Sequence, residues 1–146
     1  MFDSSTDVAA AAVDEAGAVR ATIARALEAW ARGDGRVYAA SFTPDCSDVA
    51  LFGLCRDGRA ANAELHGALF HCAAKKVAMS ADIESLEWLC DEVALVRTAS
   101  FGAAAGYQTY VMVKRGGVWL IRSFQHTPVD RLTSWVAGVW RDRVRG

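Results

Sequence analysis

Five side chains in this sequence belong to the types that move protons between carbon and oxygen atoms. The imidazole of His66 titrates near neutral pH, so it suits a general acid or base. Asp45 follows Pro44 and is placed to orient His66 or to act as the base itself. Hydrogen-bond donors that would stabilise an enolate oxygen are Tyr110, Arg97 and His126. Such a set would support enolisation, aldol-type cyclisation, isomerisation or dehydration of a small carbonyl compound.

Each of these residues also has a simpler structural interpretation, which the sequence leaves open. His66 would fit a neutral core histidine with a satisfied hydrogen bond, and Asp45 a turn or capping residue. Arg97 and Arg122 are flanked by apolar residues, and a buried arginine needs a carboxylate or an anionic ligand. An arginine at a sheet edge with its head in water is the commoner arrangement.

Aromatic residues along the chain are core residues in one interpretation and the lining of a ligand pocket in the other. A pocket lined by aromatic side chains would suit a flat, apolar, polycyclic or polyene ligand. The candidate ligand-binding residues are Trp30, Tyr38, Phe42, Phe70, Trp88, Trp119 and Phe124.

The spacing of polar residues argues against a metal or a cofactor. His66 and His71 are five residues apart on an expected helix, which does not place them on one face. The sequence shows no glycine-rich nucleotide-binding fingerprint and no nucleophile elbow. We therefore expect neither metal nor cofactor.

Helices are expected in the first half of the chain. Val19, Ile23, Leu27 and Trp30 form one apolar stripe, which predicts a helix that begins at Asp14 and stops at a glycine-rich turn. A short helix limited by Pro44, a strand over residues 47–52 and a third helix over residues 59–73 follow. His66 and Phe70, four residues apart, share one side of that third helix.

The hydrophobic period changes to two in the second half of the chain. Four strands are predicted, over residues 77–89, 93–101, 107–114 and 118–127. Their connectors are short, which favours an antiparallel meander. Helices followed by a sheet make an α+β architecture, with a bent sheet that wraps the first helix and leaves a cone-shaped pocket. Apolar residues occur at both strand parities, so the second sheet face needs a cover and a homodimer is expected.

The composition limits the class of protein and its partners. With 146 residues, 53% of them hydrophobic, the chain is long enough to bury one core. We expect a flexible segment over residues 1–12, one domain over residues 13–128 and an amphipathic helix over residues 129–146. A formal net charge of −1 argues against a nucleic-acid partner. The absence of a long apolar run argues against a membrane span, and an acidic N-terminus against export, so a cytoplasmic protein is expected.

The order of these elements, together with several short motifs, resembles the NTF2-like superfamily, more closely its SnoaL-like branch and the SgcJ/EcaC-type proteins. The resemblance covers roughly residues 14–127. It departs from the family at His126, where asparagine is common, and in the additional C-terminal helix. The matching segments are residues 30–35 (WARGDG), 42–45 (FTPD), 57–59 (DGR), His66 with Phe70, 91–96 (DEVALV), 118–121 (VWLI) and 124–127 (FQHT).

This resemblance implies a cone-shaped sheet with a polar site at one end, where enzymes of this fold use an Asp or an Asp/His pair. It also implies a small-molecule pocket protein of bacterial secondary metabolism that acts without a cofactor on a polyketide-like or enediyne intermediate. The alternative is a non-catalytic ligand-binding or accessory dimer that assists a polyketide synthase. Because the superfamily fold hosts many activities, the resemblance is more specific for the fold than for a reaction.

Overall fold

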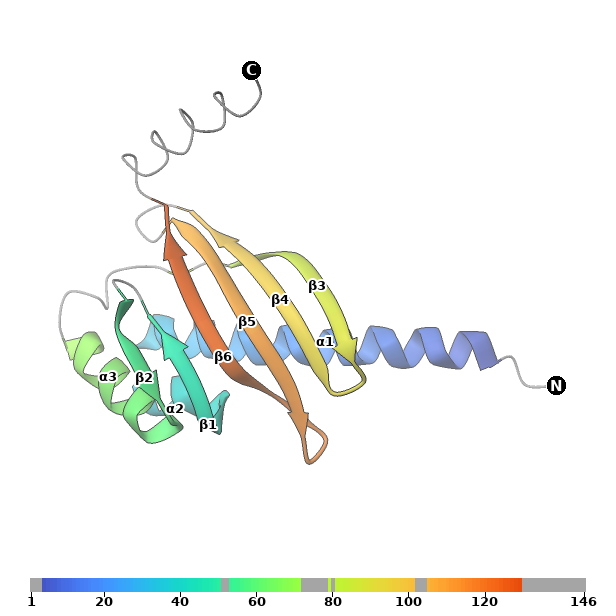
Figure 1. The fold of residues 1–146 in the computed structure, drawn as a ribbon, viewed down its shortest axis with the longest axis horizontal. Coiled ribbons are helices and arrows are strands. Elements are labelled where there is room, and N and C mark those ends of the chain that lie inside the picture. The colour runs from blue at the N-terminus through green and yellow to red at the C-terminus, as the bar shows by residue number, and fades with distance from the viewer. Residues whose placement is uncertain (1–3, 51–52, 72–78, 80, 102–104, 130–146) are drawn as a thin grey trace, which may run out of the picture.

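The helices in the described part of the chain lie on one face of a curved six-stranded sheet (Figure 1). The computed structural model describes residues 4–50, 53–71, 79, 81–101 and 105–129. The helices are α1 (Ser4–Arg32), α2 (Gly35–Ala40) and α3 (Arg59–His71). The expected α+β architecture, with helices first and a curved sheet after them, is confirmed.

The sheet has the strand order β2-β1-β6-β5-β4-β3. Strands β3 to β6 form the expected antiparallel meander, whereas β1 pairs with β6 in parallel. The parallel pair joins the first half of the chain to its last described strand, and the sequence pattern did not predict it. The strands are β1 (Phe42–Val49), β2 (Cys55–Asp57), β3 (Asp82–Cys90), β4 (Val93–Ser100), β5 (Gly106–Arg115) and β6 (Val118–Pro128).

Helix α1 is longer than the sequence pattern predicts. It begins at Ser4 rather than Asp14, so the small residues before the apolar stripe continue the helix. The stripe is buried as expected, with Val19, Ile23 and Trp30 each at most 7% exposed. Asp34 caps the next helix, because its carboxylate accepts a 3.0 Å hydrogen bond from the Val37 amide. The helix expected over residues 129–146 lies outside the described residues, apart from Val129.

The inner face of the sheet is organised in rows that run across neighbouring strands. Going along the strands, the rows become more polar, so one end of the interior is apolar and the other carries hydrogen-bonding groups. The first row contains Trp88, Ala94, Met112, Ile121 and Phe42. The second contains Leu86, Val96, Tyr110, Phe124 and Asp48. The third contains Ile83, Thr98, Gln108 and His126.

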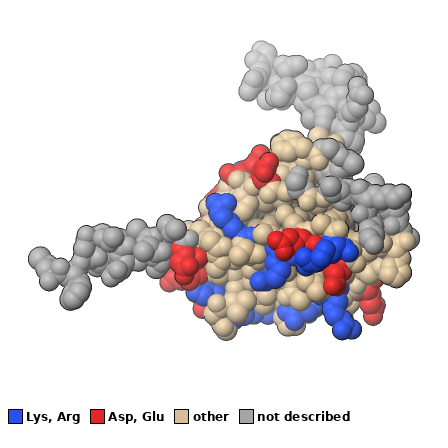
Figure 2. Space-filling model, turned by 180° about the vertical axis from the view of Figure 1, so that it is seen from behind, with Lys and Arg blue, Asp and Glu red and all other residues tan. Residues whose placement is uncertain are grey.

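The outer face of the sheet turns away from the helices, toward the viewer of Figure 1. It carries half-buried apolar side chains at its centre, such as Leu95 and Val111, and exposed ones such as Tyr107, which is 48% exposed. On the opposite, helical side, Figure 2 shows basic and acidic side chains intermixed. Among the described residues, no helix is long and apolar enough to cross a membrane.

Candidate active site

A buried carboxylate and a buried imidazole face each other beneath α3. Asp48 comes from the inner face of β1 and His66 from the middle of α3, and both side chains are at most 1% exposed. The His66 Nε2 atom lies 4.0 Å from the Asp48 Oδ2 atom, which is ion-pair range but longer than a hydrogen bond. This pair is the candidate site.

Asn62 holds both members of the pair. Its side-chain Nδ2 donates a 2.7 Å hydrogen bond to Asp48 Oδ2. Its backbone carbonyl lies 2.9 Å from His66 Nδ1, and because a carbonyl only accepts, Nδ1 carries the proton. The lone pair of Nε2 therefore faces Asp48. Within the described part of the chain, the other oxygens of this group, Asp48 Oδ1 and Asn62 Oδ1, are buried without a hydrogen-bond partner.

Burial changes the acidity of both groups. Desolvation raises the pKa of Asp48 to about 7, although the hydrogen bond from Asn62 acts in the opposite direction. Desolvation lowers the pKa of His66 to about 4, against the effect of its bond to the Asn62 carbonyl. At neutral pH the imidazole is therefore neutral, and the carboxyl group is close to its titration point. A carboxylate with this pKa is matched to accept and return protons at physiological pH.

Aromatic rings surround His66. The ring centroids of Tyr38, Trp30 and Phe70 lie 4.2, 5.6 and 6.0 Å from that of the imidazole. Tyr38 also contacts Phe42, at 5.1 Å between centroids. These rings exclude water from the pair, which is the physical cause of its shifted pKa values. They include four of the aromatic residues that the sequence analysis assigned to a ligand pocket.

Tyr110 and Phe124 continue the aromatic wall along the second row, with ring centroids 5.0 Å apart. Tyr110 is 3% exposed, and desolvation raises the pKa of its phenol, with the Asp48 charge adding to this effect. The hydroxyl therefore keeps its proton, and it shares a side-chain hydrogen bond with Thr98. The role expected for Tyr110, a donor to an enolate oxygen, stays a prediction.

Three side chains of the third row, together with Ser100 further along β4, form a second group of buried polar side chains, which we call the Gln108 ladder: Thr98, Ser100, Gln108 and His126. Thr98 Oγ1 donates to Gln108 Oε1 at 2.6 Å, and Gln108 Nε2 donates to Ser100 Oγ at 2.7 Å. The same Nε2 lies 3.4 Å from His126 Nε2. All four side chains are at most 6% exposed.

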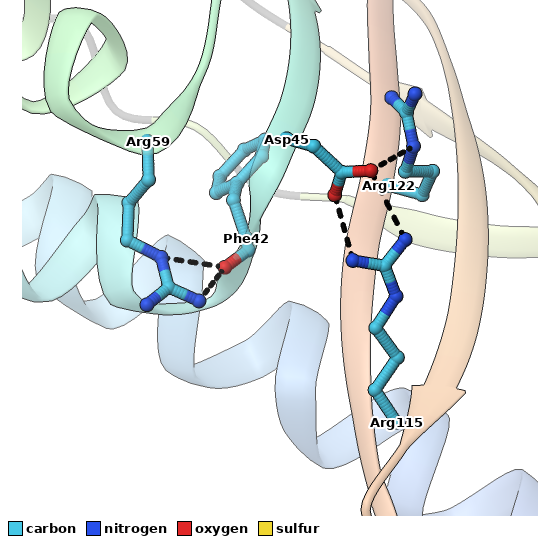
Figure 3. Close-up of polar contacts among 5 residues, drawn as sticks. All are labelled: Phe42, Asp45, Arg59, Arg115 and Arg122. Carbon is cyan, nitrogen blue, oxygen red and sulfur yellow. Dashed lines mark hydrogen bonds and ion pairs between the residues drawn. The ribbon is translucent and has the colours of Figure 1, made fainter.

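Asp45, expected beside His66, lies on the other side of the sheet. It is exposed and accepts hydrogen bonds of 2.7 and 3.1 Å from the two terminal nitrogens of Arg115. Arg122 lies 3.4 Å from the same carboxylate (Figure 3). The Arg115 hydrogen bonds hold the pKa of Asp45 well below its usual range. Residues alternate between faces along β1, so Asp48, three residues on, faces inward instead.

The two arginines flagged in the sequence also lie outside the site. Arg122 pairs with Asp45, and Arg97 is 3.8 Å from Glu84 on the exposed outer face. Neither guanidinium reaches the buried pair, so the interpretation as exposed surface arginines holds. Arg59, which Figure 3 shows nearby, instead ties the start of α3 to β1 through two hydrogen bonds to the Phe42 carbonyl.

Trp88 and Trp119 form their own pair at the apolar end of the sheet, with centroids 5.5 Å apart. Trp88 is 41% exposed, whereas Trp119 is buried and donates a hydrogen bond to Glu15 of α1. That bond and one from Lys114 hold the pKa of Glu15 below its usual value. Trp119 therefore fixes α1 to the sheet, and both tryptophans lie outside the row that contains Asp48.

A hollow of about 360 Å³ lies between α1 and β3, lined mainly by small and apolar residues that include Ile23, Leu27 and Ile83. Arg20 and Asp82 also line it. This volume is within the range of small-molecule sites. In the described ranges, no cluster of three or more metal-ligating side chains occurs.

Sequence reasoning missed Asp48, Asn62 and Gln108, although each carried a signal. Asn62 lies four residues before His66, which places it on the same helix face. Gln108 has the parity of Tyr110 on the same strand, so it had to share the inner face. Asp48 has the parity of the buried Cys46, not that of Asp45.

Comparison with known proteins identifies the fold. No family model and no curated protein sequence matches the chain. Solved structures do match. A protein of unknown function with a cystatin-like fold from Nostoc punctiforme PCC 73102 has a TM-score of 0.73 and 19% identity, over 86% of this chain and 85% of that one. The chain has an NTF2-like, cystatin-like fold.

Two further structures agree with this assignment. An NTF2-like protein from Novosphingobium aromaticivorans gives a TM-score of 0.69 at 18% identity, over 90% of this chain and 93% of that one. A ketosteroid isomerase-like protein from Erwinia carotovora atroseptica SCRI1043 gives 0.70 at 19% identity, over 78% and 95%. At these identities the likeness concerns the NTF2-like fold, and the function has to be argued from the site.

Proposed function

We propose that this NTF2-like protein binds an apolar small molecule and catalyses cofactor-independent proton transfer at a carbon next to a carbonyl group. The observation that carries the proposal is Asp48, a fully buried carboxyl group with a pKa of about 7 and, in the described chain, one oxygen without a partner. A buried polar atom without a partner is costly, and a bound ligand would repair it. The same fold occurs in the ketosteroid isomerase-like protein, a likeness that supports an isomerase-type reaction.

In the proposed reaction the Asp48 carboxylate removes the proton from the α-carbon, and the electron pair moves onto the carbonyl oxygen. Tyr110, whose phenol stays protonated, donates a hydrogen bond to that enolate oxygen. Asp48 then returns the proton to the same or another carbon, which gives exchange or isomerisation. Neutral His66 acts as a positioning residue, because it faces Asp48 without competing for the proton.

The aromatic wall favours a flat, apolar substrate, and the sequence resemblance supports a polyketide-like intermediate of bacterial secondary metabolism as its class. Cyclisation or dehydration would use the same enolate. We further propose, on the resemblance alone, that a polyketide synthase is a partner and that the protein works as a cytoplasmic homodimer.

The alternative is a binding module without chemistry, and one observation favours it: His66 Nε2 and Asp48 Oδ2 are 4.0 Å apart, beyond hydrogen-bond reach. Such a protein would use the aromatic rings around His66 to hold a ligand. It would leave the ligand's α-protons untouched.

Hydrogen–deuterium exchange of 2-tetralone, an apolar bicyclic ketone, separates the two functions. We expect the protein to accelerate exchange at the α-carbons in D₂O, followed by NMR. The Asp48→Asn variant should lose this acceleration by a factor of about 10² to 10⁴, because the base is gone. Asp45→Asn is the matched control and should exchange at the unchanged rate. Binding of 2-tetralone without acceleration would instead establish the binding module.

A further inference from the structure

We infer that Asn62 is a positioning residue for proton transfer: its side-chain amide binds Oδ2 of Asp48 and leaves Oδ1 as the oxygen that takes the proton from the ligand. The two side chains meet where α3 packs against β1, and both are fully buried. This inference rests on the proposed function, because it names the atom through which the Asp48 carboxylate would act.

The hydrogen bond from Asn62 makes the two oxygens of the Asp48 carboxylate unequal. Asn62 Nδ2 donates to Asp48 Oδ2 at 2.7 Å, whereas Asp48 Oδ1 has no hydrogen-bond partner in the described part of the chain. The reverse orientation of the amide would place two acceptor oxygens 2.7 Å apart, which an ionised carboxylate disfavours. A proton on Oδ2 would weaken this bond, because a carboxyl hydroxyl is a poorer acceptor than a carboxyl carbonyl. Oδ1 can take the proton with the bond intact.

The backbone around Asn62 is tied to the strand that carries Asp48. The Gly58 amide donates a 2.7 Å hydrogen bond to the Cys46 carbonyl of β1, and the Asn62 amide donates at 3.0 Å to the Gly58 carbonyl. The backbone of Asn62 is therefore fixed relative to β1, and its short side chain has little freedom. Its own carbonyl lies 2.9 Å from His66 Nδ1. One residue thus orients both members of the buried pair.

The stability of α3 does not explain an asparagine at this position. Asparagine ranks below alanine and leucine in the interior of a helix, because its side chain competes for backbone hydrogen bonds. Asn62 is also fully buried, where an apolar side chain would be the ordinary choice. Departures from such local rules are expected at functional sites.

Titratable groups surround Asp48 on several elements: Tyr38 of α2, His66 of α3, Cys46 of β1 and Tyr110 of β5. Desolvation lowers the pKa of His66 to about 4. It raises the pKa values of Tyr38, Cys46 and Tyr110 above their usual range. These groups keep their charge states near neutral pH, so a titration of this cluster with a midpoint near 7 reports on Asp48, whose pKa desolvation raises to about 7.

The first experiment uses Asn62 itself as the probe, because it is the only asparagine in the sequence. Protein labelled with ¹⁵N-asparagine gives one side-chain amide nitrogen signal by NMR. Without any ligand, we expect this signal to move with pH around a midpoint near 7, and Asp48→Ala to abolish the movement. Asp45→Ala is the matched control and should leave the midpoint unchanged. An amide signal of the wild type that does not titrate near neutral pH would overturn the inference.

The same spectra test which oxygen of Asp48 takes the proton. If Oδ1 takes it, the N–H of Asn62 stays hydrogen-bonded to Oδ2. Its proton signal should then remain downfield of its position in Asp48→Ala on both sides of the midpoint. A signal that moves to the Asp48→Ala position below the midpoint would mean that Oδ2 takes the proton, and would refute the assignment of Oδ1.

The pH–rate profile of 2-tetralone exchange tests the consequence for the reaction. In Asn62→Leu the carboxylate loses a bond that favours its ionised form, so the midpoint should move up by about one pH unit. The rate at pH 7 should then fall about fivefold and recover as the pH rises. Glu64→Leu, the same substitution type on the exposed side of α3, is the control and should keep the wild-type profile. A folded Asn62→Leu protein whose rate falls by one factor at every pH would show a purely structural role.

The two proposals fail in different ways. If the Asn62 signal titrates with Asp48 but 2-tetralone exchange is not accelerated, the catalytic function is wrong and the transfer step with it, while the bond to Oδ2 stands. If exchange depends on Asp48 but neither the amide signal nor the Asn62→Leu profile shows a coupling, the positioning role is wrong and the catalytic function stands.

Discussion

Two aspartates three residues apart on β1 have opposite surroundings. Asp45 is solvated and paired with Arg115, which favours its ionised form, whereas Asp48 is buried and favours its protonated form. His66, buried beside Asp48, also favours its neutral form. The surroundings of each side chain, rather than its type, decide which groups can exchange protons near neutral pH.

The buried pair makes opposite contributions to the pH dependence of stability. Between pH 4 and 6.5 the unfolded chain protonates His66 and the folded one does not, so His66 alone makes the free energy of unfolding rise with pH. Between about pH 4 and 7 the folded chain keeps the Asp48 proton and the unfolded one loses it, so Asp48 alone makes stability fall. In the wild type the two effects largely cancel.

Single variants should separate these contributions. The free energy of unfolding of Asp48→Asn should rise as the pH increases from 4 to 6.5, because only the His66 contribution is left. That of His66→Gln should fall as the pH increases from 4 to 7, because only the Asp48 contribution is left. Each change should be on the order of 3 kcal/mol. Urea denaturation at several pH values measures both. Slopes of the same sign in the two variants would contradict the assigned protonation states.

At the scale of elements, the sequence predicted the α1 stripe, the meander and the shared side of His66 and Phe70, because each has a regular period. It did not predict the start of β1 at Phe42. The strand contains Pro44, which lacks an amide hydrogen, and the β1·β6 register shifts between Phe42 and Ser47. The strand accommodates the proline in this irregular segment, whereas sequence rules treat a proline as the end of an element.

The pairing of Asp48 with Phe124 on β6 depends on that irregularity, and its depth depends on how α3 sits against the rest of the fold. A single-sequence pattern contains the alternation along each strand, but not the register between β1 and β6. For this reason His66 and Tyr110 could be nominated from the sequence, while the partner of His66 could not.

The contact between α2 and α3 is a close backbone approach at Gly35. A Cβ atom there would lie 2.6 Å from the Gly67 amide nitrogen and 3.0 Å from the His66 carbonyl carbon. Gly35→Ala should therefore push α3 outward, with a loss of about 1 to 3 kcal/mol in the free energy of unfolding.

Gly67 provides the matched control, because a Cβ atom at that position meets nothing within 4 Å. Gly67→Ala should be neutral or stabilising by up to about 1 kcal/mol, since alanine favours the helix. Thermal or urea unfolding of both variants tests the contact. Equal stability of the two proteins would show that the α2–α3 approach is not tight.

At the scale of the whole molecule, the described helices cover one face of the sheet, and the other carries Leu95 and Val111 side by side across β4 and β5. An antiparallel sheet commonly has one solvated face, but such a face is usually polar. The apolar centre of this one supports the expected homodimer, with a second copy of the chain as its cover.

Replacement of an apolar residue on this face should separate the copies. We expect sedimentation of the wild type to give twice the 15.7 kDa of one chain, and Leu95→Glu to give the single-chain mass. Ala31→Glu, an exposed position on α1, is the control and should leave the mass unchanged. A wild-type protein that sediments with the mass of one chain at micromolar concentration would contradict the prediction of a homodimer.

The parallel pairing of β1 with β6 also has a consequence for the order of events in folding. Residues 42–49 pair with the nearby strand β2 on one side, but on the other side they pair with residues 121–125, so this part of the sheet cannot close until almost the whole domain is available. During synthesis, Asp48 and His66 both leave the ribosome long before the strand that locks β1 in place. Folding dominated by such distant pairings is slow, in the range of milliseconds to seconds. The aspartate and the histidine thus meet late, and a chain that stops short of β6 contains both residues but not the pair.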